Sequence, residues 1–178
     1  MLHEVSGDLL LSKAALLAHG VAPGDDFKHG LALAIRERFP ALYKDFRHYC
    51  KTYHPKPGEV WSWAGVGPDG KPVRIVTLFT QEPSDREGGL PGVAHPEYVN
   101  RALHALAKIV TEEAIASVAI PRLATGVGRL DWDAVKPMIA TTLGPLRTDV
   151  FVYSSYVKGQ QANEVAKVSK GYAGTSHK

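Results

Sequence analysis

The chain has a single cysteine, Cys50, among its 178 residues. One thiol excludes an internal disulfide and any site that needs several thiolate ligands. The eight histidines are scattered without the spacing that metal ligands show, so we expect no metal site.

Long apolar runs are also missing. The N-terminal stretch MLHEVSGD lacks the basic and then apolar pattern of a signal peptide, and no apolar run approaches the about 20 residues that span a membrane. We therefore expect a cytoplasmic protein without a membrane partner.

The body of the chain has no excess of one charge. Four of the 21 Lys and Arg residues and one of the 18 Asp and Glu residues lie beyond Ser154, so the first 154 residues hold 17 of each. Nucleic-acid-binding domains usually carry a basic stripe on the body. We therefore expect no duplex binding through bulk charge, and a nucleic-acid partner only through an attached group or the basic tail.

Strand-like and helix-like segments alternate along the chain. Short apolar runs predict strands at residues 15–21, 59–66, 72–80, 117–121 and 149–155. Helical spacing predicts helices at residues 31–39, 41–51, 96–110 and 132–143. This alternation is typical of an α/β fold with a largely parallel sheet. We expect a domain over residues 1–154 and a basic, disordered tail over residues 155–178, because the tail is polar and has little apolar spacing.

Two loops join a predicted strand to a predicted helix through glycine. They read APGDDFKHGLA at residues 22–32 and IPRLATGVGRLDW at residues 120–132. Glycine lets the backbone approach a ligand, and the N–H groups at such a helix entry bind phosphate oxygens. Two facing loops of this kind indicate an anionic ligand, such as a diphosphate, at the strand ends.

The segments VSGDLLL, LLAHGV, HGLALAIRERFP, IPRLATGVGRLDW and VFVY follow one another in an order and spacing that resembles the macrodomain, the module that binds ADP-ribose. Within that superfamily the chain is most similar to the branch of the terminal ADP-ribose protein glycohydrolase and the yeast ADP-ribose 1''-phosphate phosphatase. The resemblance runs from about residue 5 to residue 153. It implies a three-layer α/β/α fold with a mixed, largely parallel central sheet, ADP-ribose or an ADP-ribosylated macromolecule as the partner, and no cofactor.

The resemblance also implies the binding residues. Asp8 matches the residue that accepts from the adenine amine, and the Leu9 backbone N–H matches the adjacent adenine contact. The residues that match the positions around the distal ribose and diphosphate are Lys28, His29, Gly30, Leu31, Thr125, Gly126, Val127, Gly128 and Arg129. The family usually has small residues where this chain has Lys28 and His29, so these two either crowd the ligand or, for Lys28, add charge to diphosphate binding.

Two aromatic residues near the implied pocket have open roles. Tyr153 at the end of the last predicted strand could stack on adenine, and Phe27 could cover the distal ribose. Both could equally be aromatic residues at the pocket edge.

The catalytic pair of the glycohydrolase is absent. Its lysine and aspartate match Gln81 and Gly128 here, and neither an amide nor a hydrogen atom replaces an amine nucleophile or a carboxylate base. A lysine-dependent mechanism is therefore not predicted. His19 matches a histidine of the phosphatase, where it could act as a general acid or base or only hold the pocket floor by a hydrogen bond.

Three functions remain open from the sequence. A reader would bind ADP-ribose without turnover, and a phosphatase would use His19 on ADP-ribose 1''-phosphate. A hydrolase with an altered site would need a group from Asp85, Glu87 or His95 in the long polar loop. Separately, the basic tail could tether the domain to RNA or another partner.

Overall fold

A mixed six-stranded sheet forms the centre of the computed structural model, which describes residues 1–86 and 88–165. The strand order is β1-β6-β5-β2-β4-β3. The strands are β1 (Leu2–Gly7), β2 (Leu16–Val21), β3 (Val60–Val66), β4 (Pro72–Phe79), β5 (Ser117–Pro121) and β6 (Asp149–Tyr156). Only β3, at one edge, pairs antiparallel with its neighbour; the other pairs are parallel. This confirms the predicted mixed, largely parallel sheet.

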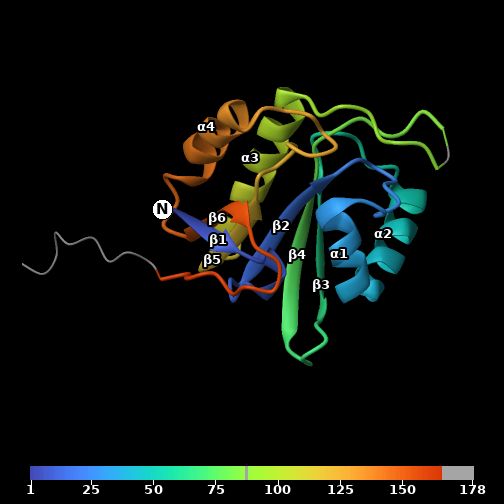
Figure 1. The fold of residues 1–178 in the computed structure, drawn as a ribbon. Coiled ribbons are helices and arrows are strands. Elements are labelled where there is room, and N and C mark those ends of the chain that lie inside the picture. Colours follow the sequence, from blue (N-terminus) through green and yellow to red (C-terminus); the bar gives the residue numbers. More distant parts are fainter. Residues whose placement is uncertain (87, 166–178) are drawn as a thin grey trace, which may run out of the picture.

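Two pairs of helices cover the two faces of the sheet (Figure 1). α1 (Gly30–Arg38) and α2 (Pro40–Tyr53) pack on one face through an aromatic-rich core that includes Phe46 and Phe79. α3 (Pro96–Glu112) and α4 (Trp132–Leu143) pack on the other face through an aliphatic core. The predicted three-layer α/β/α arrangement is therefore confirmed.

The residues at the helix entries explain why the chain becomes helical there. Pro40 and Pro96 stand in the first turns of α2 and α3, where a missing N–H costs nothing. Asp131 caps α4, because its side chain accepts a hydrogen bond from the backbone N–H of Asp133. Pro96 and Asp131 thereby mark where the loops after β4 and β5 end and the helices begin.

The strand β1 was not predicted from the sequence. Of its six residues only Gly7 is buried, because β1 lies at the sheet edge and pairs only with β6. An edge strand with half-exposed faces leaves a weak apolar pattern. Its position matters, because Asp8 follows the carboxyl end of β1. This end lies on the same side of the sheet as the carboxyl ends of β2, β5 and β6.

The end of the described chain returns to the domain. The predicted boundary at residue 154 falls inside β6, which ends at Tyr156. Beyond it, the Gly159 N–H donates to Asp8 Oδ2 and the Asp8 N–H donates to the Gln160 carbonyl, at 3.0 and 2.7 Å. Residues 166–178 of the predicted disordered tail lie outside the described residues. Among the helices of the described part, none has the length and apolar character to cross a membrane.

Candidate functional site

A cleft runs across the carboxyl ends of the parallel strands. Its larger part, about 1120 Å³, is lined by Asp8, Leu9 and Tyr153 among others. Its smaller part, about 290 Å³, lies between the two glycine-bearing loops and ends at Gln81. The residues that line both parts are Gly30, Leu31, Pro121 and Arg122. We therefore treat the two hollows as one site, called the cleft below.

The first loop, between β2 and α1, is anchored to the core by the side chain of Phe27. This side chain is fully buried and packs against Phe46 and Tyr43, so it does not cover the cleft. The Phe27 backbone has φ 54°, and its N–H donates to Asp25 Oδ1 at 2.7 Å. Gly30, at φ 55°, then begins α1 in a conformation that favours glycine.

The start of α1 offers hydrogen-bond donors to the cleft. His29 precedes the helix and makes no side-chain cap. The first turn of a helix has no internal partners for its N–H groups, which therefore point outward at its N-terminus. His29, Gly30, Leu31 and Ala32 all line the small part of the cleft, so the donor-bearing end of α1 borders it.

The second loop, between β5 and α4, is closed by its own backbone. Ala124 and Arg129 both have positive φ, 61° and 62°, and the Leu130 N–H donates to the Ala124 carbonyl at 2.9 Å. A Cβ on Gly128 would lie 2.7 Å from the Ala124 oxygen, so a side chain does not fit there. A Cβ on Gly126 would meet nothing within 4 Å.

The two loops face each other with free N–H groups. Within residues 1–86 and 88–165, the N–H groups of Gly126, Val127 and Gly128 donate no hydrogen bond. All three residues line the small part of the cleft, opposite the first turn of α1. Backbone donors on both walls, with the positive end of a helix dipole on one of them, form a binding site for an anion.

Asp8 stands at the opposite end of the cleft and is held in place by backbone groups. Its Oδ1 caps the short helix η1 (Leu9–Leu11) by accepting from the Leu10 N–H at 3.0 Å, and its Oδ2 accepts from Gly159. Each carboxylate oxygen can accept a second hydrogen bond. In the described part of the chain the Leu9 N–H donates no hydrogen bond, so an acceptor and a donor lie side by side here.

Tyr153 borders the same end of the cleft, but most of its ring is buried in the core under α1 and α2. Its hydroxyl donates to Glu164 Oε2 at 2.7 Å. Burial raises the pKa of Tyr153, so the phenol stays protonated at neutral pH. The buried ring favours the role of a pocket-edge residue over a full stacking platform.

His19 lies beneath the cleft, next to the lining residue Gly20, and is only 1% exposed. Its Nε2 is 2.8 Å from Thr77 Oγ1, and its ring meets Phe27 edge-on. Burial lowers the pKa of His19 to about 3, which keeps the ring neutral. Because His19 is not among the residues that line the cleft, this placement favours its structural role over acid–base chemistry on a bound phosphate.

Gln81 closes the far end of the cleft. It is buried, its Nε2 donates to the Gly92 carbonyl at 3.1 Å, and its backbone forms a bridge with Ala94. The amide is therefore used to hold the Gly92 end of the loop that follows β4. No amine of the kind that the lysine mechanism needs stands at this position.

Asp25 is a carboxylate in the cleft that the sequence reasoning did not select. It lines the small part of the cleft together with Gln81. Burial raises the pKa of Asp25, and the neighbouring Asp26 adds to this effect. Arg122, which the sequence reasoning also missed, lines both parts of the cleft. Both residues lie in loops that follow predicted strands, and this position is the sequence signal that could have identified them.

Two other catalytic candidates, Asp85 and His95, lie away from the cleft. Asp85 is exposed in the long loop, and His95 precedes α3 and packs edge-on against Tyr98. Neither lines the cleft. Glu87 lies outside the described residues.

Besides His19, three more of the expected binding residues do not line the cleft. Thr125 turns its hydroxyl to the Arg122 carbonyl at 3.0 Å, and Arg129 donates its N–H to the Gly126 carbonyl at 3.1 Å. Both therefore hold the shape of the second loop. Lys28 is largely exposed and lines a separate hollow on the outer side of the first loop.

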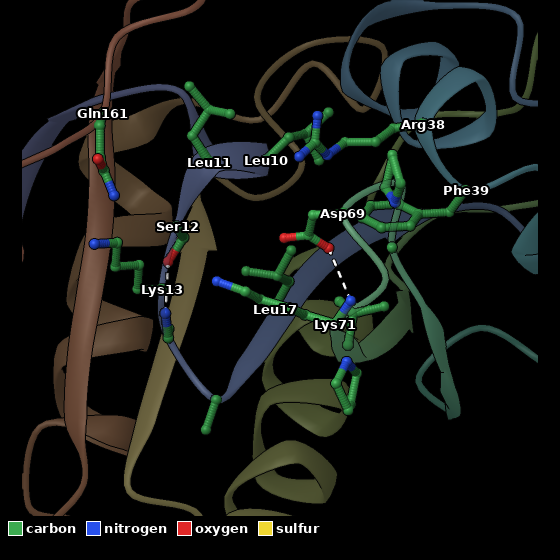
Figure 2. A pocket seen from close by; sticks show the side chains of 16 residues that line it. Leu10, Leu11, Ser12, Lys13, Leu17, Arg38, Phe39, Asp69, Lys71 and Gln161 are labelled. Atoms are coloured by element: carbon green, nitrogen blue, oxygen red, sulfur yellow. Dashed lines mark hydrogen bonds between the residues drawn. The ribbon is translucent and has the colours of Figure 1, made fainter.

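A further hollow of about 650 Å³ adjoins the Asp8 end of the cleft and shares Arg38 with it. Figure 2 shows Lys13 and Lys71 on its two sides, with Asp69 accepting from the Lys71 backbone N–H at 3.0 Å. None of the residues implied to bind ADP-ribose lines this hollow, so it is not part of the candidate site.

A cleft at parallel strand ends with backbone donors on both walls defines an α/β domain of the nucleotide-binding kind. The family model for the Macro domain matches residues 18–139, which is more than half of the chain. The chain therefore belongs to the macrodomain family, as its sequence motifs indicated.

Solved structures agree with this fold. The macrodomain of Thermus aquaticus DarG matches with a TM-score of 0.71 and 25% identity, covering 86% of this chain and 98% of that chain. Thermosipho africanus DarTG in complex with ADP-ribose matches with a TM-score of 0.73 and 20% identity, covering 90% of this chain and 42% of that one.

Curated relatives include two DNA ADP-ribosyl glycohydrolases. The Mycobacterium tuberculosis protein is 28% identical over 149 residues, which is 83% of this chain. The Thermus aquaticus protein is 29% identical over 157 residues, which is 86% of this chain. The chain spans only 40% and 41% of the length of these relatives.

Proposed function

We propose that the cleft binds ADP-ribose, either free or as the ADP-ribosyl group of a macromolecule. The observation that carries the proposal is the pair of facing loops, with free N–H groups at Gly126, Val127 and Gly128 opposite the uncapped start of α1. This pair suits a diphosphate, because two walls of backbone donors can each bind one phosphate.

The ends of the cleft give the ligand a direction. Asp8 and the Leu9 N–H offer an acceptor and a donor side by side, which matches the amine and the adjacent ring nitrogen of adenine. The distal ribose then lies in the small part of the cleft, toward Asp25 and Gln81. The anomeric carbon and the group attached to it point to the outer end of that part.

A second function, removal of the ADP-ribosyl group by water, is supported by the position of Asp25. As an anion, this carboxylate would take a proton from water as the water oxygen bonds to the anomeric carbon. The bond from that carbon to the carrier breaks, and the carrier atom leaves with the bonding electrons and takes up a proton. The lysine route is not part of this proposal, because Gln81 and Gly128 stand at the two matching positions.

We propose DNA as the carrier, since the curated relatives are named DNA ADP-ribosyl glycohydrolases. The phosphatase alternative has less support, because its one candidate group, His19, is buried beneath the cleft and stays neutral. We also propose the cytoplasm as the location of the protein.

Calorimetric titration with ADP-ribose tests the first proposal, and the same preparation is then assayed on an ADP-ribosylated DNA oligonucleotide and on ADP-ribose 1''-phosphate. We expect binding of ADP-ribose and release of the ADP-ribosyl group from DNA. Binding without any turnover would leave a reader. No binding of ADP-ribose would overturn the proposed function, and phosphate release would restore the phosphatase alternative.

A further inference from the structure

A third hollow, about 580 Å³, opens next to the outer end of the cleft. It shares Asp25 and Pro91 with the small part of the cleft, so the two adjoin. Its walls are the first loop, α1, α2 and the long loop that follows β4, which Figure 1 shows reaching over toward α2. We call this hollow the outer groove.

The outer groove is strongly basic. Among the described residues, its cationic lining residues are Lys28, Arg36, Arg47, Lys51 and Arg86, against two carboxylates, Asp25 and Asp26. Among the described residues, only Lys28 of these five cations has a carboxylate within 4.0 Å, that of Asp26. The first 154 residues as a whole hold equal numbers of acidic and basic residues, so this excess is a local property.

Two cations of the outer groove, Arg36 and Arg47, lie over the ring of Tyr43. The Arg36 guanidinium lies 4.0 Å from the centre of the Tyr43 ring and donates to the Asp26 carbonyl at 2.9 Å. Arg47 lies 5.9 Å from the same ring. Stacking on an aromatic ring holds a guanidinium in place while its outer N–H donors remain available.

Arg47 and Lys51 stand one helical turn apart on the exposed side of α2. Like charges at this spacing repel each other. A ligand with regularly spaced anions would remove that repulsion, and separate cations along a groove fit such a ligand better than a single phosphate.

We propose that the outer groove holds the phosphodiester strand of the DNA that carries the ADP-ribosyl group. This rests on the proposed function, because a distal ribose in the small part of the cleft directs the attached carrier to the end that adjoins the groove. Binding of the strand releases counterions from its phosphates, which is the main driving force for such contacts.

The test compares two double variants with the same loss of charge. Arg47→Gln with Lys51→Gln removes two exposed cations of the outer groove. Lys13→Gln with Lys71→Gln removes two exposed cations from the hollow in Figure 2, at the other end of the cleft. The four side chains do not line the cleft.

The probes are free ADP-ribose, a single-stranded ADP-ribosylated DNA oligonucleotide and an ADP-ribosylated acidic peptide. We expect the outer-groove variant to bind free ADP-ribose as the parent does and to bind the modified DNA about tenfold more weakly. Its plot of log K against log salt for that DNA should be shallower by about 1.4, because each phosphate contact on a single strand contributes about 0.7. The control variant should match the parent.

Electrophoresis of the oligonucleotide after each titration checks that the ADP-ribosyl group is still attached. Unchanged DNA affinity in the outer-groove variant, or an equal loss in the control variant, would overturn this proposal while leaving ADP-ribose binding in place. A loss that affects the peptide but not the DNA would make an acidic protein the carrier instead. A parent that does not bind free ADP-ribose would overturn the proposed function and this proposal together.

Discussion

The carboxylate of Asp8 accepts a hydrogen bond from the backbone N–H of Gly159 at 3.0 Å, although the two residues are 151 positions apart in the chain. This contact brings the segment after β6 to the end of the cleft where we place adenine. Gly7, just before Asp8, has no room for a side chain, because a Cβ there would lie 2.9 Å from the Ala162 Cβ. The segment at residues 157–165 is therefore part of the wall that holds Asp8 in position.

Glu164 fixes the far end of this segment, and its loss should loosen it. The carboxylate accepts from the Ser12 hydroxyl, the Lys13 N–H and the Tyr153 hydroxyl, at 2.6, 2.9 and 2.7 Å. We expect Glu164→Ala to lower the free energy of unfolding by about 1–3 kcal/mol, since a buried hydroxyl and a backbone donor lose their acceptor. Urea unfolding measures this. Asn163→Ala, next to it and exposed, is the control, and equal stability of the two variants would contradict the anchoring role.

Gly126 and Gly128 allow a matched test of the second loop. A side chain at Gly126 meets no atom within 4 Å, so Gly126→Phe should fold with little loss of stability and fill the small part of the cleft. We expect it to abolish detectable ADP-ribose binding in calorimetry.

Gly128→Ala, in contrast to Gly126→Phe, should destabilise the fold. The new Cβ would lie 2.7 Å from the Ala124 oxygen and 2.9 Å from the Ala94 Cβ, so the loop must shift. We expect a loss of about 1–3 kcal/mol in the free energy of unfolding, as for other overpacked sites. Full ADP-ribose affinity in Gly126→Phe would show that the ligand does not pass between the loops.

The helices and five of the six strands could be predicted, because apolar periodicity and the entry residues Pro40, Pro96 and Asp131 are local signals. The strand β1 could not, since an edge strand with half-exposed faces leaves a weak apolar pattern. The contacts of residues 157–165 could not be predicted either, because they depend on distant residues such as Asp8 and Ser12.

The site was predicted in part. The motifs located the two loops and Asp8, which depend on sequence-local turns. They did not reveal that the His19 side chain faces the core, because the packing of the folded sheet decides which side of a strand is buried. Nor did the balanced charge of residues 1–154 reveal the outer groove, whose cations come from the first loop, α1, α2 and the long loop. Charge counted along a chain does not show which charges fold together.

Asp25 should control the pH dependence of any removal of the ADP-ribosyl group. Burial raises the pKa of Asp25 above its ordinary value of 3.8, and a general base works only when ionised. Activity should therefore fall as the pH drops through this raised pKa, giving an acid limb in the profile of kcat/KM. We expect Asp25→Asn to lower kcat about 100-fold or more with unchanged ADP-ribose affinity. Asp85→Asn, exposed and outside the cleft, is the control, and wild-type turnover in Asp25→Asn would exclude the carboxylate as the base.

His19 should make the fold sensitive to acid. In the unfolded chain the imidazole takes up a proton near pH 6.5, whereas burial lowers its pKa to about 3 in the folded protein. The unfolded state therefore binds more protons between these values, and the stability contributed by the neutral ring is complete above pH 6.5 and is lost as the pH falls toward 3. Between pH 7 and pH 5 this amounts to about 2 kcal/mol. Urea unfolding of His19→Gln, which cannot titrate, should lack that part of the loss, while His48→Gln, exposed on α2, should follow the parent. Parallel pH dependence in His19→Gln and the parent would mean that His19 can be protonated in the folded state, which would again make it a candidate acid.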